Sequence, residues 1–396
     1  MDRGPRYSGR RRGIPSFAAD GIASIGLVRE VRFWPEIATE NVSTECRTDF
    51  LSKATSIDTY IYFSPKTSRT AMDSVREMKG ASIVVNDCAG VQPGEDVLVV
   101  SDWQVADVAE RVAAAANERD ANVTMTLMDP REYDGNEPEP SVAAAMKEAD
   151  VVFMPVHRSI THSNAASEAA EAGARLVSLV KFTDEQLVQG GLYADYEEMK
   201  PHCEEMARKF GDAREAHITS PQGTDVTVGL KGRDGNAHPG IVREPGEFTA
   251  LVHIEANISP VEGTTEGIVV FDGAIPNLDI GVLEDPVRME MEEGSVTSVE
   301  GGREAQRIAN VWVDHDDPAV YNIAQLAVGM NPECSEFNGW FSNDHGRYGN
   351  VHFGIGTSSN LGGTTRAPVH FDAMMAEPTM ELDGEVVIED GEFTFF

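Results

Sequence analysis

The sequence contains few lysines, few cysteines and no long apolar run, and each shortage excludes a class of protein. Only 8 of its 32 Lys and Arg residues are lysine, against 66 Asp and Glu, and the formal net charge is −34. Because carboxylates repel phosphate groups, nucleic acid and anionic membranes are unfavourable partners. Such an acidic excess is typical of proteins from a salt-rich cytoplasm, where screening weakens the repulsion between like charges. We therefore expect a halophilic, cytoplasmic protein.

The cysteines are too few and too far apart for a metal knuckle or a disulfide framework. Cys46, Cys88, Cys203 and Cys334 form no Cys-x-x-Cys pair, which zinc knuckles and thiol redox motifs require. Free thiols in a reducing compartment are therefore expected. The chain also lacks a stretch of about 20 apolar residues, the length that a membrane-spanning helix needs.

The first 71 residues differ in composition from the rest. They carry 11 Lys and Arg against 8 Asp and Glu, whereas the remainder is strongly acidic. Three arginines at positions 10–12 precede a weakly apolar stretch, but Asp20 and several glycines and prolines interrupt it, which argues against a targeting segment. We expect residues 1–71 to be a disordered extension, or a stretch upstream of a true start at Met72 or Met78.

Residues 72–215 alternate between apolar runs and amphipathic segments. The runs DVLVVS, NVTMTLMD, VVFMPV and ARLVSLV predict strands at 96–101, 122–129, 151–156 and 174–180. The segments between them have helical spacing, and a further helix is expected from Tyr193 to Phe210. This alternation is typical of a Rossmann-like α/β domain with a parallel sheet. Because Asp102-Trp103-Gln104 follows the first strand in place of Gly-x-Gly-x-x-Gly, we expect no dinucleotide cofactor.

Residues 216–396 favour a β-rich (α+β) second domain with a metal site. Short strands between glycine-bearing turns are expected at FTALVHIEA, EGIVVFDGAI, SVTSVEGG, NVHFGIG and GEVVIEDGEF. His370 and Asp372 alternate in one extended segment, which places both side chains on the same face, and His352 could add a third ligand from a neighbouring strand. Imidazoles with one carboxylate suit Fe, Zn, Co or Mn and leave coordination positions open. Ordinary hydrogen-bonded histidines are the alternative.

The order of several short segments resembles a known family. HIEANISP, NIAQLAVGMNP, VHFGIGTSSN and PVHFDAMM, with weaker matches in THSNAASEAAEAGARL and PQGTDVTVGLKGR, are similar to metallo-aminopeptidases typified by aminopeptidase T and to the related 2,5-dihydroxypyridine 5,6-dioxygenases. The resemblance covers about residues 75–392. It implies a metal centre lined by Glu255, His352, His370 and Asp372, with Glu255 as the catalytic group that transfers a proton.

Two positions depart from the aminopeptidase pattern. Gln325 and Ser359 stand where the peptidases place a metal-binding glutamate and a tyrosine. Losing one carboxylate favours one divalent metal ion per chain over a two-metal centre. Because the aminopeptidases account for most of the resemblance, we place metal-dependent removal of N-terminal residues from peptides first. The alternative is a mononuclear non-haem Fe(II) dioxygenase that cleaves a dihydroxylated, pyridine-like ring, and the third hypothesis is an inactive binding protein.

Further side chains could belong to the same centre. His345 and Tyr348 are candidates for proton transfer, and His253 alternates with Glu255 on one strand face. We expect a small-molecule or peptide substrate, no nucleic acid and no membrane as partners, and we leave open a homo-oligomer.

Three histidines elsewhere have simpler interpretations. His315 lies in the acidic run VWVDHDDPAV, where we expect an aspartate-capped turn before the next helix. His157 and His162 follow a predicted strand at the carboxyl edge of the parallel sheet, where open α/β sheets bind ligands. Loop histidines hydrogen-bonded to the backbone are the alternative there.

Overall fold

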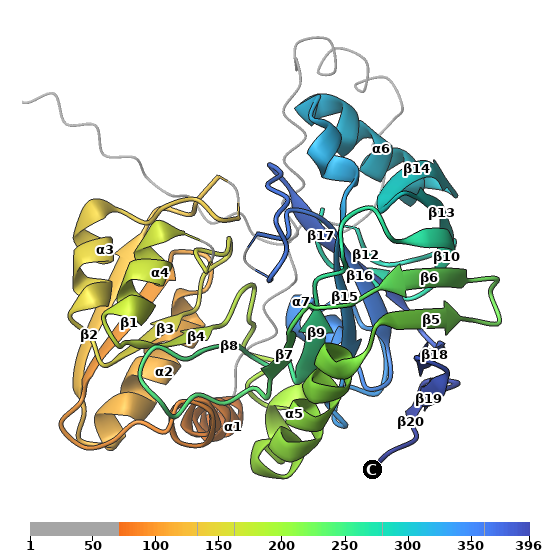
Figure 1. Ribbon diagram of the computed structural model, residues 1–396. Coiled ribbons are helices and arrows are strands. Elements are labelled where there is room, and N and C mark those ends of the chain that lie inside the picture. Colours follow the sequence, from red (N-terminus) through yellow and green to blue (C-terminus); the bar gives the residue numbers. More distant parts are fainter. Residues whose placement is uncertain (1–70, 133, 162, 279, 360) are drawn as a thin grey trace, which may run out of the picture. The chain divides into compact units, whose positions relative to one another are not determined.

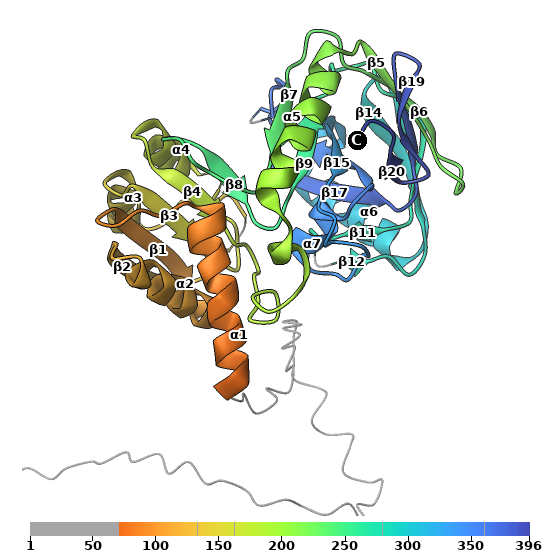
Figure 2. The same cartoon turned by 90° about the horizontal axis from the view of Figure 1, so that it is seen from below.

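The structure, a computed structural model, describes residues 71–396 apart from residues 133, 162, 279 and 360 (Figures 1 and 2). The predicted extension, apart from Ala71, therefore lies outside the described residues, as do Cys46 and His162. The described residues belong to one compact unit that spans Lys66–Phe396. Within them no helix is long and apolar enough to cross a membrane. The three described cysteines are buried free thiols, as expected.

The first sheet is parallel throughout, as the alternating pattern predicts. Its strands lie in the order β2-β1-β3-β4-β8. The predicted strands and helices correspond to β1 (Asp96–Asp102), α2 (Ala106–Glu118), β2 (Asn122–Met128), α3 (Pro140–Lys147), β3 (Val151–Met154), α4 (Asn164–Glu171) and β4 (Arg175–Ser178). The fifth strand, β8 (Phe248–Ala250), comes from a segment that we had assigned to the β-rich part of the chain.

Alternate residues of β1 pack against helices on opposite faces of this sheet. Val97 and Val99 lie in the apolar core that includes α2, whereas Leu98 and Val100 lie in a second core with α3 and α4. A parallel strand covered on both faces needs apolar residues at every position, which explains the continuous run in β1. The first helix, α1 (Ala71–Ser82), continues into the π-helical turn η1 (Ile83–Cys88) and packs on α2.

The β-rich part of the chain forms antiparallel sheets. An eight-stranded sheet has the order β14-β13-β10-β6-β5-β18-β19-β20, and a five-stranded sheet has the order β17-β16-β15-β9-β7. The strands of the larger sheet are β5 (Glu215–Thr219), β6 (Asp225–Gly229), β10 (Glu266–Phe271), β13 (Val287–Glu292), β14 (Ser295–Glu300), β18 (Thr379–Leu382), β19 (Glu385–Glu389) and β20 (Glu392–Phe393). Those of the smaller are β7 (Gly235–His238), β9 (Glu255–Ile258), β15 (Ile323–Gly329), β16 (Val351–Gly356) and β17 (His370–Met375), and a separate hairpin pairs β11 (Ala274–Ile275) with β12 (Gly281–Val282).

Helices and short turns of helix connect these sheets. They are η2 (Gly190–Tyr193), α5 (Tyr196–Asp212), α6 (Arg303–His315), η3 (Pro318–Tyr321) and α7 (Phe341–Gly346). Helix α5 was predicted, and α6 and α7 were not. His315 is the last residue of α6, and the Asp317 carboxylate accepts a hydrogen bond from Ala319 N at the start of η3, which confirms the predicted cap.

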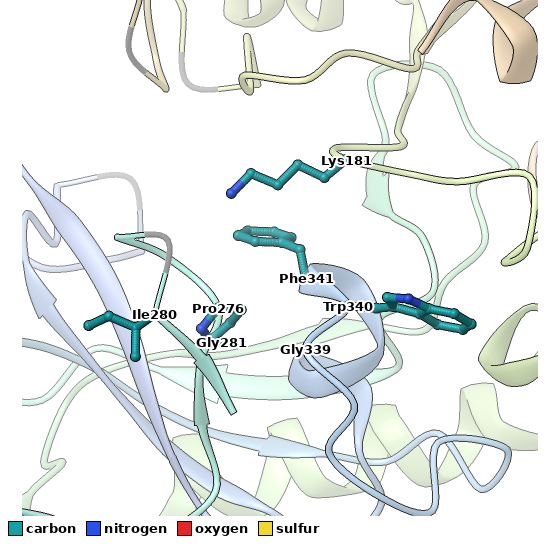
Figure 3. Close-up of a pocket in the computed structure, with 7 residues that line it drawn as sticks. All are labelled: Lys181, Pro276, Ile280, Gly281, Gly339, Trp340 and Phe341. Carbon is teal, nitrogen blue, oxygen red and sulfur yellow. The ribbon is translucent and has the colours of Figure 1, made fainter. Parts of the chain in front are cut away.

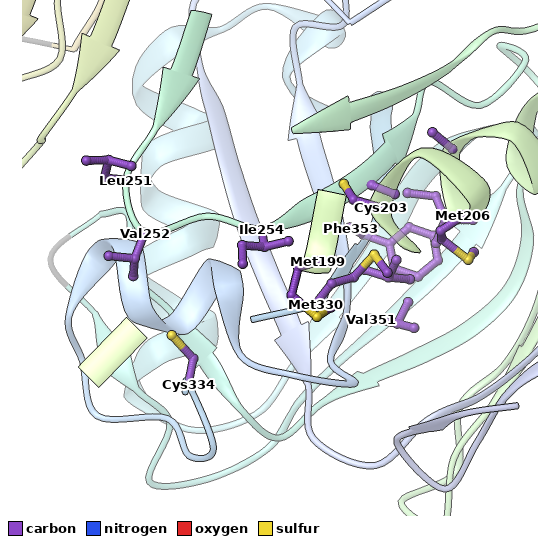
Figure 4. Packing of buried hydrophobic residues seen from close by; sticks show 14 of the residues in the cluster. Met199, Cys203, Met206, Leu251, Val252, Ile254, Met330, Cys334, Val351 and Phe353 are labelled. Atoms are coloured by element: carbon purple, nitrogen blue, oxygen red, sulfur yellow. The ribbon is translucent and has the colours of Figure 1, made fainter. Parts of the chain in front are cut away.

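Helix α5 fixes the position of the five-stranded sheet. Met199, Cys203 and Met206 share one face of this helix and are buried in the core together with Phe353 of β16 (Figure 4). The Cys203 thiol also donates a hydrogen bond to the carbonyl oxygen of Glu255, at 3.0 Å. The first residue of β9 is thereby held to the helix.

Candidate metal centre

The register of the five-stranded sheet gathers the predicted residues on one face. Residues opposite each other in paired strands share a face, and so does every second residue within a strand. By the pairing of β9, β15, β16 and β17, one face carries Glu255, Gln325, His352, His370 and Asp372. The strand pattern predicted the shared face of His370 and Asp372, and the sheet order adds the other three residues.

A glycine in β16 makes room for this group. Gly354 lies opposite Gln325 on one side and Asp372 on the other. A Cβ atom at this position would lie 2.8 Å from Cε1 of His370 and 2.8 Å from Cβ of Gln325. Glycine therefore allows the His370 imidazole to lie across the strand.

Glu255 and His352 form the first of two groups on this face. His352 Nε2 lies 3.3 Å from Oε2 of Glu255, and both side chains are buried. The other carboxylate oxygen, Oε1, accepts hydrogen bonds from the side-chain amides of Asn257 at 2.9 Å and Gln325 at 3.1 Å. Gln325, which we had considered only as a poor ligand, therefore orients the carboxylate.

His345, Asp372 and His370 form the second group. Asp372 Oδ2 lies 3.1 Å from Nε2 of His345, and Asp372 Oδ1 lies 3.3 Å from Nε2 of His370. The Asp372 backbone N–H donates to Oδ1 of Asn277 at 3.0 Å. The rings of His345 and His352 are 5.7 Å apart and perpendicular, so the two groups adjoin. Helix α7 thus adds a histidine as close to Asp372 as His370 is.

Each of these three histidines has its Nδ1 atom bound by a protein oxygen. His345 Nδ1 donates to the carbonyl of Phe341 at 2.6 Å, and His370 Nδ1 donates to the carbonyl of Thr357 at 2.8 Å. His352 Nδ1 lies 2.8 Å from Oδ1 of Asn350. The orientation of this amide is fixed, because its nitrogen donates to the carbonyls of residues 345 and 347. All three rings therefore direct Nε2 toward the carboxylates.

Neighbouring imidazoles keep both carboxylates ionised in spite of burial. Burial raises the pKa of the Glu255 carboxyl, but the adjacent histidines, chiefly His352, lower it to about 2. Burial likewise raises the pKa of Asp372, whereas His370 and His345 hold it well below its usual range. For the two imidazoles, burial lowers the pKa, but Asp372 raises it above the ordinary value.

Of the remaining candidates, His253 adjoins this cluster and Tyr348 does not. The His253 ring stacks on that of His345 with centroids 4.7 Å apart, and burial, followed by the effect of His345, lowers its pKa to about 3. It precedes β9 and is not part of that strand. The Tyr348 ring packs edge-to-face on Phe393, 5.2 Å away, and none of its described contacts reaches the carboxylates. His238, which we did not consider, lies opposite Glu255 in β7.

The donor atoms fit a cation. His352 Nε2 and Asp372 Oδ1 are buried without a hydrogen bond of good geometry. With Nδ1 protonated, Nε2 presents a lone pair to an oxygen lone pair, which is unfavourable unless a proton or a metal ion lies between them. Among the described residues, no three His, Cys, Asp or Glu side chains already surround a common point. The donors pair with one another instead, in two adjacent groups.

A cavity of about 230 Å³ adjoins the second group (Figure 3). Its lining includes Lys181, Pro276, Ile280, Trp340, Phe341 and two glycines. The Phe341 ring lies 4.6 Å from the His345 ring, centroid to centroid, and the carbonyl of Phe341 is the acceptor for His345 Nδ1. One aromatic residue thus belongs both to the cavity wall and to the histidine cluster.

Comparison with known proteins identifies the family. A family model of 2,5-dihydroxypyridine 5,6-dioxygenases matches residues 83–395. The chain belongs to this family. A 2,5-dihydroxypyridine 5,6-dioxygenase of Pseudomonas putida is 26% identical over 189 residues, which are 46% of this chain and 54% of that enzyme. The chain thus spans about half the length of this curated relative.

Two solved structures share the fold. The 2,5-dihydroxypyridine dioxygenase from Pseudomonas putida KT2440 superposes with a TM-score of 0.71 at 20% identity, over 82% of this chain and 98% of that one. AmpT from Thermus thermophilus gives a TM-score of 0.60 at 15% identity, over 81% and 99%. The predicted resemblance and fold class are confirmed. The family match supports the dioxygenase alternative over the aminopeptidase hypothesis that we placed first.

Proposed function

We propose that this protein is a ring-cleaving dioxygenase that uses one divalent metal ion, Fe(II), and acts on a dihydroxylated, pyridine-like aromatic ring. The observation that carries the proposal is the arrangement of His345, His352 and His370. Each has Nδ1 bound by a protein oxygen and Nε2 directed at an ionised carboxylate, as in metal sites whose outer hydrogen bonds orient the ligands. The family match supports the choice of substrate class.

His352, His370 and Asp372 would hold the metal, with His345 as a further donor. Two histidines and one carboxylate are the ligand set of non-haem Fe(II) oxygenases. When bound, the ion would supply redox chemistry and open coordination positions. Gln325 supports a single ion, because its amide donates to Glu255 where a two-metal peptidase would place another carboxylate.

The chain itself would bind the ring and move protons. Phe341 lines the cavity beside His345 and offers an apolar surface that an aromatic ring can contact. Glu255 is ionised and buried, and its Oε2 atom, 3.3 Å from His352 Nε2, is the oxygen that would accept a proton from a substrate hydroxyl. Burial of the cluster excludes bulk water from the reacting ring.

The test is metal content and activity of protein prepared in high salt without oxygen. We expect about one iron per chain and oxygen consumption with 2,5-dihydroxypyridine. His370→Ala and Asp372→Ala should each lose the metal. His217→Ala should retain it, because His217 is a half-exposed histidine of β5 that pairs with Asp225 of β6. Two zinc, cobalt or manganese ions per chain, with hydrolysis of leucine p-nitroanilide, would establish the aminopeptidase hypothesis instead. Stable metal-free protein without either activity would favour the inactive binding protein.

A further inference from the structure

The loop that joins β16 to β17 orients one of the proposed metal ligands. It comprises residues 357–369 and has no helix or strand among its described residues. The carbonyl oxygen of its first residue, Thr357, accepts the hydrogen bond from Nδ1 of His370 at 2.8 Å. The backbone N–H of Thr357 donates to the carbonyl of Val369 at 2.9 Å, so the loop begins and ends beside this histidine. The position of Thr357 therefore sets the orientation of the His370 ring.

An ion pair from outside the loop holds its far side. Glu262 lies in the connection between β9 and β10, and its Oε1 atom accepts hydrogen bonds from Thr364 N at 2.7 Å and Thr364 Oγ1 at 2.9 Å. Its Oε2 atom pairs with Arg233 of the β6–β7 connection. The same guanidinium donates to the carbonyl of Gly362 at 2.6 Å. The side chains of Glu262 and Arg233 are only 30% and 15% exposed, so water weakens these charge-assisted hydrogen bonds little.

Hydrogen bonds within the loop connect this ion pair to the start of the loop. Thr365 donates its N–H to Oγ of Ser358 at 3.2 Å, and its carbonyl accepts hydrogen bonds from Ser358 N at 3.0 Å and Thr357 Oγ1 at 3.2 Å. Thr365 directly follows Thr364, the residue that Glu262 binds. A displacement of Thr364 would therefore be transmitted to Thr357.

The loop also reaches the other group of the cluster. The carbonyl of Leu361 accepts a long hydrogen bond, 3.4 Å, from the side-chain amide of Asn236. This amide also donates to Oδ1 of Asn257 at 3.0 Å, and Asn257 donates in turn to Oε1 of Glu255 at 2.9 Å. One loop is thus linked to both His370 and Glu255.

We infer that Glu262 and Arg233 form a positioning pair for the metal centre, which acts on His370 through the 357–369 loop. The inference rests on the proposed function and adds to it two side chains that lie outside the ligand set. The hydrogen-bond partner of a ligating histidine fixes its ring orientation, and loss of such a partner weakens metal binding by about 10–100-fold. The simpler alternative is that the pair only attaches a surface loop.

The first test is the exchange of imidazole N–H protons, measured by NMR at fixed pH on the metal-free full chain with isotope-labelled histidine. In Glu262→Ala the Nδ1–H of His370 should exchange about tenfold faster, because its acceptor is no longer held in place. The Nδ1–H of His345 is the internal control and should not change, since its acceptor is the carbonyl of Phe341 in α7. Glu262→Gln should keep most of the wild-type protection, because an amide oxygen can still accept from Thr364.

The second test is Co(II) binding to the same variants. Glu262→Ala should bind Co(II) about tenfold more weakly and alter its visible absorption spectrum, whereas Glu262→Gln should resemble the wild type in both. Glu95→Ala is the matched control. Glu95 pairs with Arg175 at 2.7 Å, and its side chain is 24% exposed, but this pair joins the amino ends of β1 and β4 in the parallel sheet. The control variant should bind Co(II) as the wild type does.

Each outcome decides the inference. Unchanged exchange at His370 in Glu262→Ala, equal acceleration at His370 and His345, or an equal loss of Co(II) affinity in Glu262→Ala and Glu95→Ala would overturn it. Faster exchange at His370 with unchanged Co(II) binding would reduce the pair to a loop attachment. The exchange test needs neither metal nor turnover, so the two proposals can fail separately. Selective acceleration at His370 in a chain that binds no metal would confirm the link through the loop and refute the metal centre.

Discussion

Replacing Gln325 by glutamate tests how the carboxylate of Glu255 is held. The Gln325 amide nitrogen lies 3.1 Å from Oε1 of Glu255, so the variant would place a second carboxylate beside a buried one. Two unit charges about 4 Å apart repel by about 4 kcal/mol at an effective dielectric of about 20. The lost hydrogen bond adds about 1 kcal/mol. We therefore expect the metal-free variant to lose about 4–5 kcal/mol of unfolding free energy, a large share of the stability of a typical domain.

The assay is denaturant unfolding of metal-free protein at fixed salt. Gln325→Met is the matched variant, because it removes the donor without adding charge, and we expect it to cost about 1–2 kcal/mol at every pH. In Gln325→Glu one carboxyl of the pair has a raised pKa in the folded state. The loss of unfolding free energy in Gln325→Glu is therefore small below about pH 4.3, the ordinary Glu pKa, and develops as the pH rises through the raised pKa of the folded state. A glutamate variant no less stable than the methionine variant at about pH 8 would refute the assigned contact.

Two further predictions concern the surroundings of the cluster. Gly354→Ala should cost about 1–3 kcal/mol of unfolding free energy, because the new Cβ would crowd both the His370 ring and Cβ of Gln325. In a double-mutant cycle, His370→Ala should recover the part of that cost that comes from the ring; an equal cost in both backgrounds would assign all of it to the contact with Gln325. Burial raises the pKa of Glu262, but hydrogen bonds from Thr364, together with the charge of Arg233, lower it overall. Its contribution to the free energy of unfolding is therefore present above about pH 4.3 and is lost as the pH falls through the lowered pKa. Glu262→Gln should remove this pH dependence, measured by hydrogen exchange of the 357–369 loop, and an unchanged profile would contradict it.

The parallel sheet was predictable because its signal is local. The continuous apolar run of β1 follows from burial on both faces, and the helical spacing of the next segment follows from packing on one face. The pairing of β8 with β4 was not predictable. Three residues, Phe248–Ala250, carry no pattern that distinguishes a parallel partner from an antiparallel one.

The candidate site was predictable only where its residues are close in sequence. His370 and Asp372 share a face by strand periodicity, and the same spacing in Asn350-Val351-His352 could have indicated the amide that orients His352. The pairing of His345 with Asp372 depends on the position of α7, a six-residue helix without a side-chain cap. That contact is set by tertiary packing and has no signal in the local sequence.

Charge balance in the cluster supports the proposal of one metal ion. Two ionised carboxylates, Glu255 and Asp372, lie beside three imidazoles in a buried site, where an uncompensated charge costs several kcal/mol. Without metal, Asp372 raises the pKa values of the two imidazoles beside it, although burial lowers them, so that protons on these rings would balance the charge. One divalent cation with neutral imidazoles gives the same balance, so its binding should release protons. A second divalent cation would leave a buried excess of two positive charges, and Gln325, being neutral, does not compensate it.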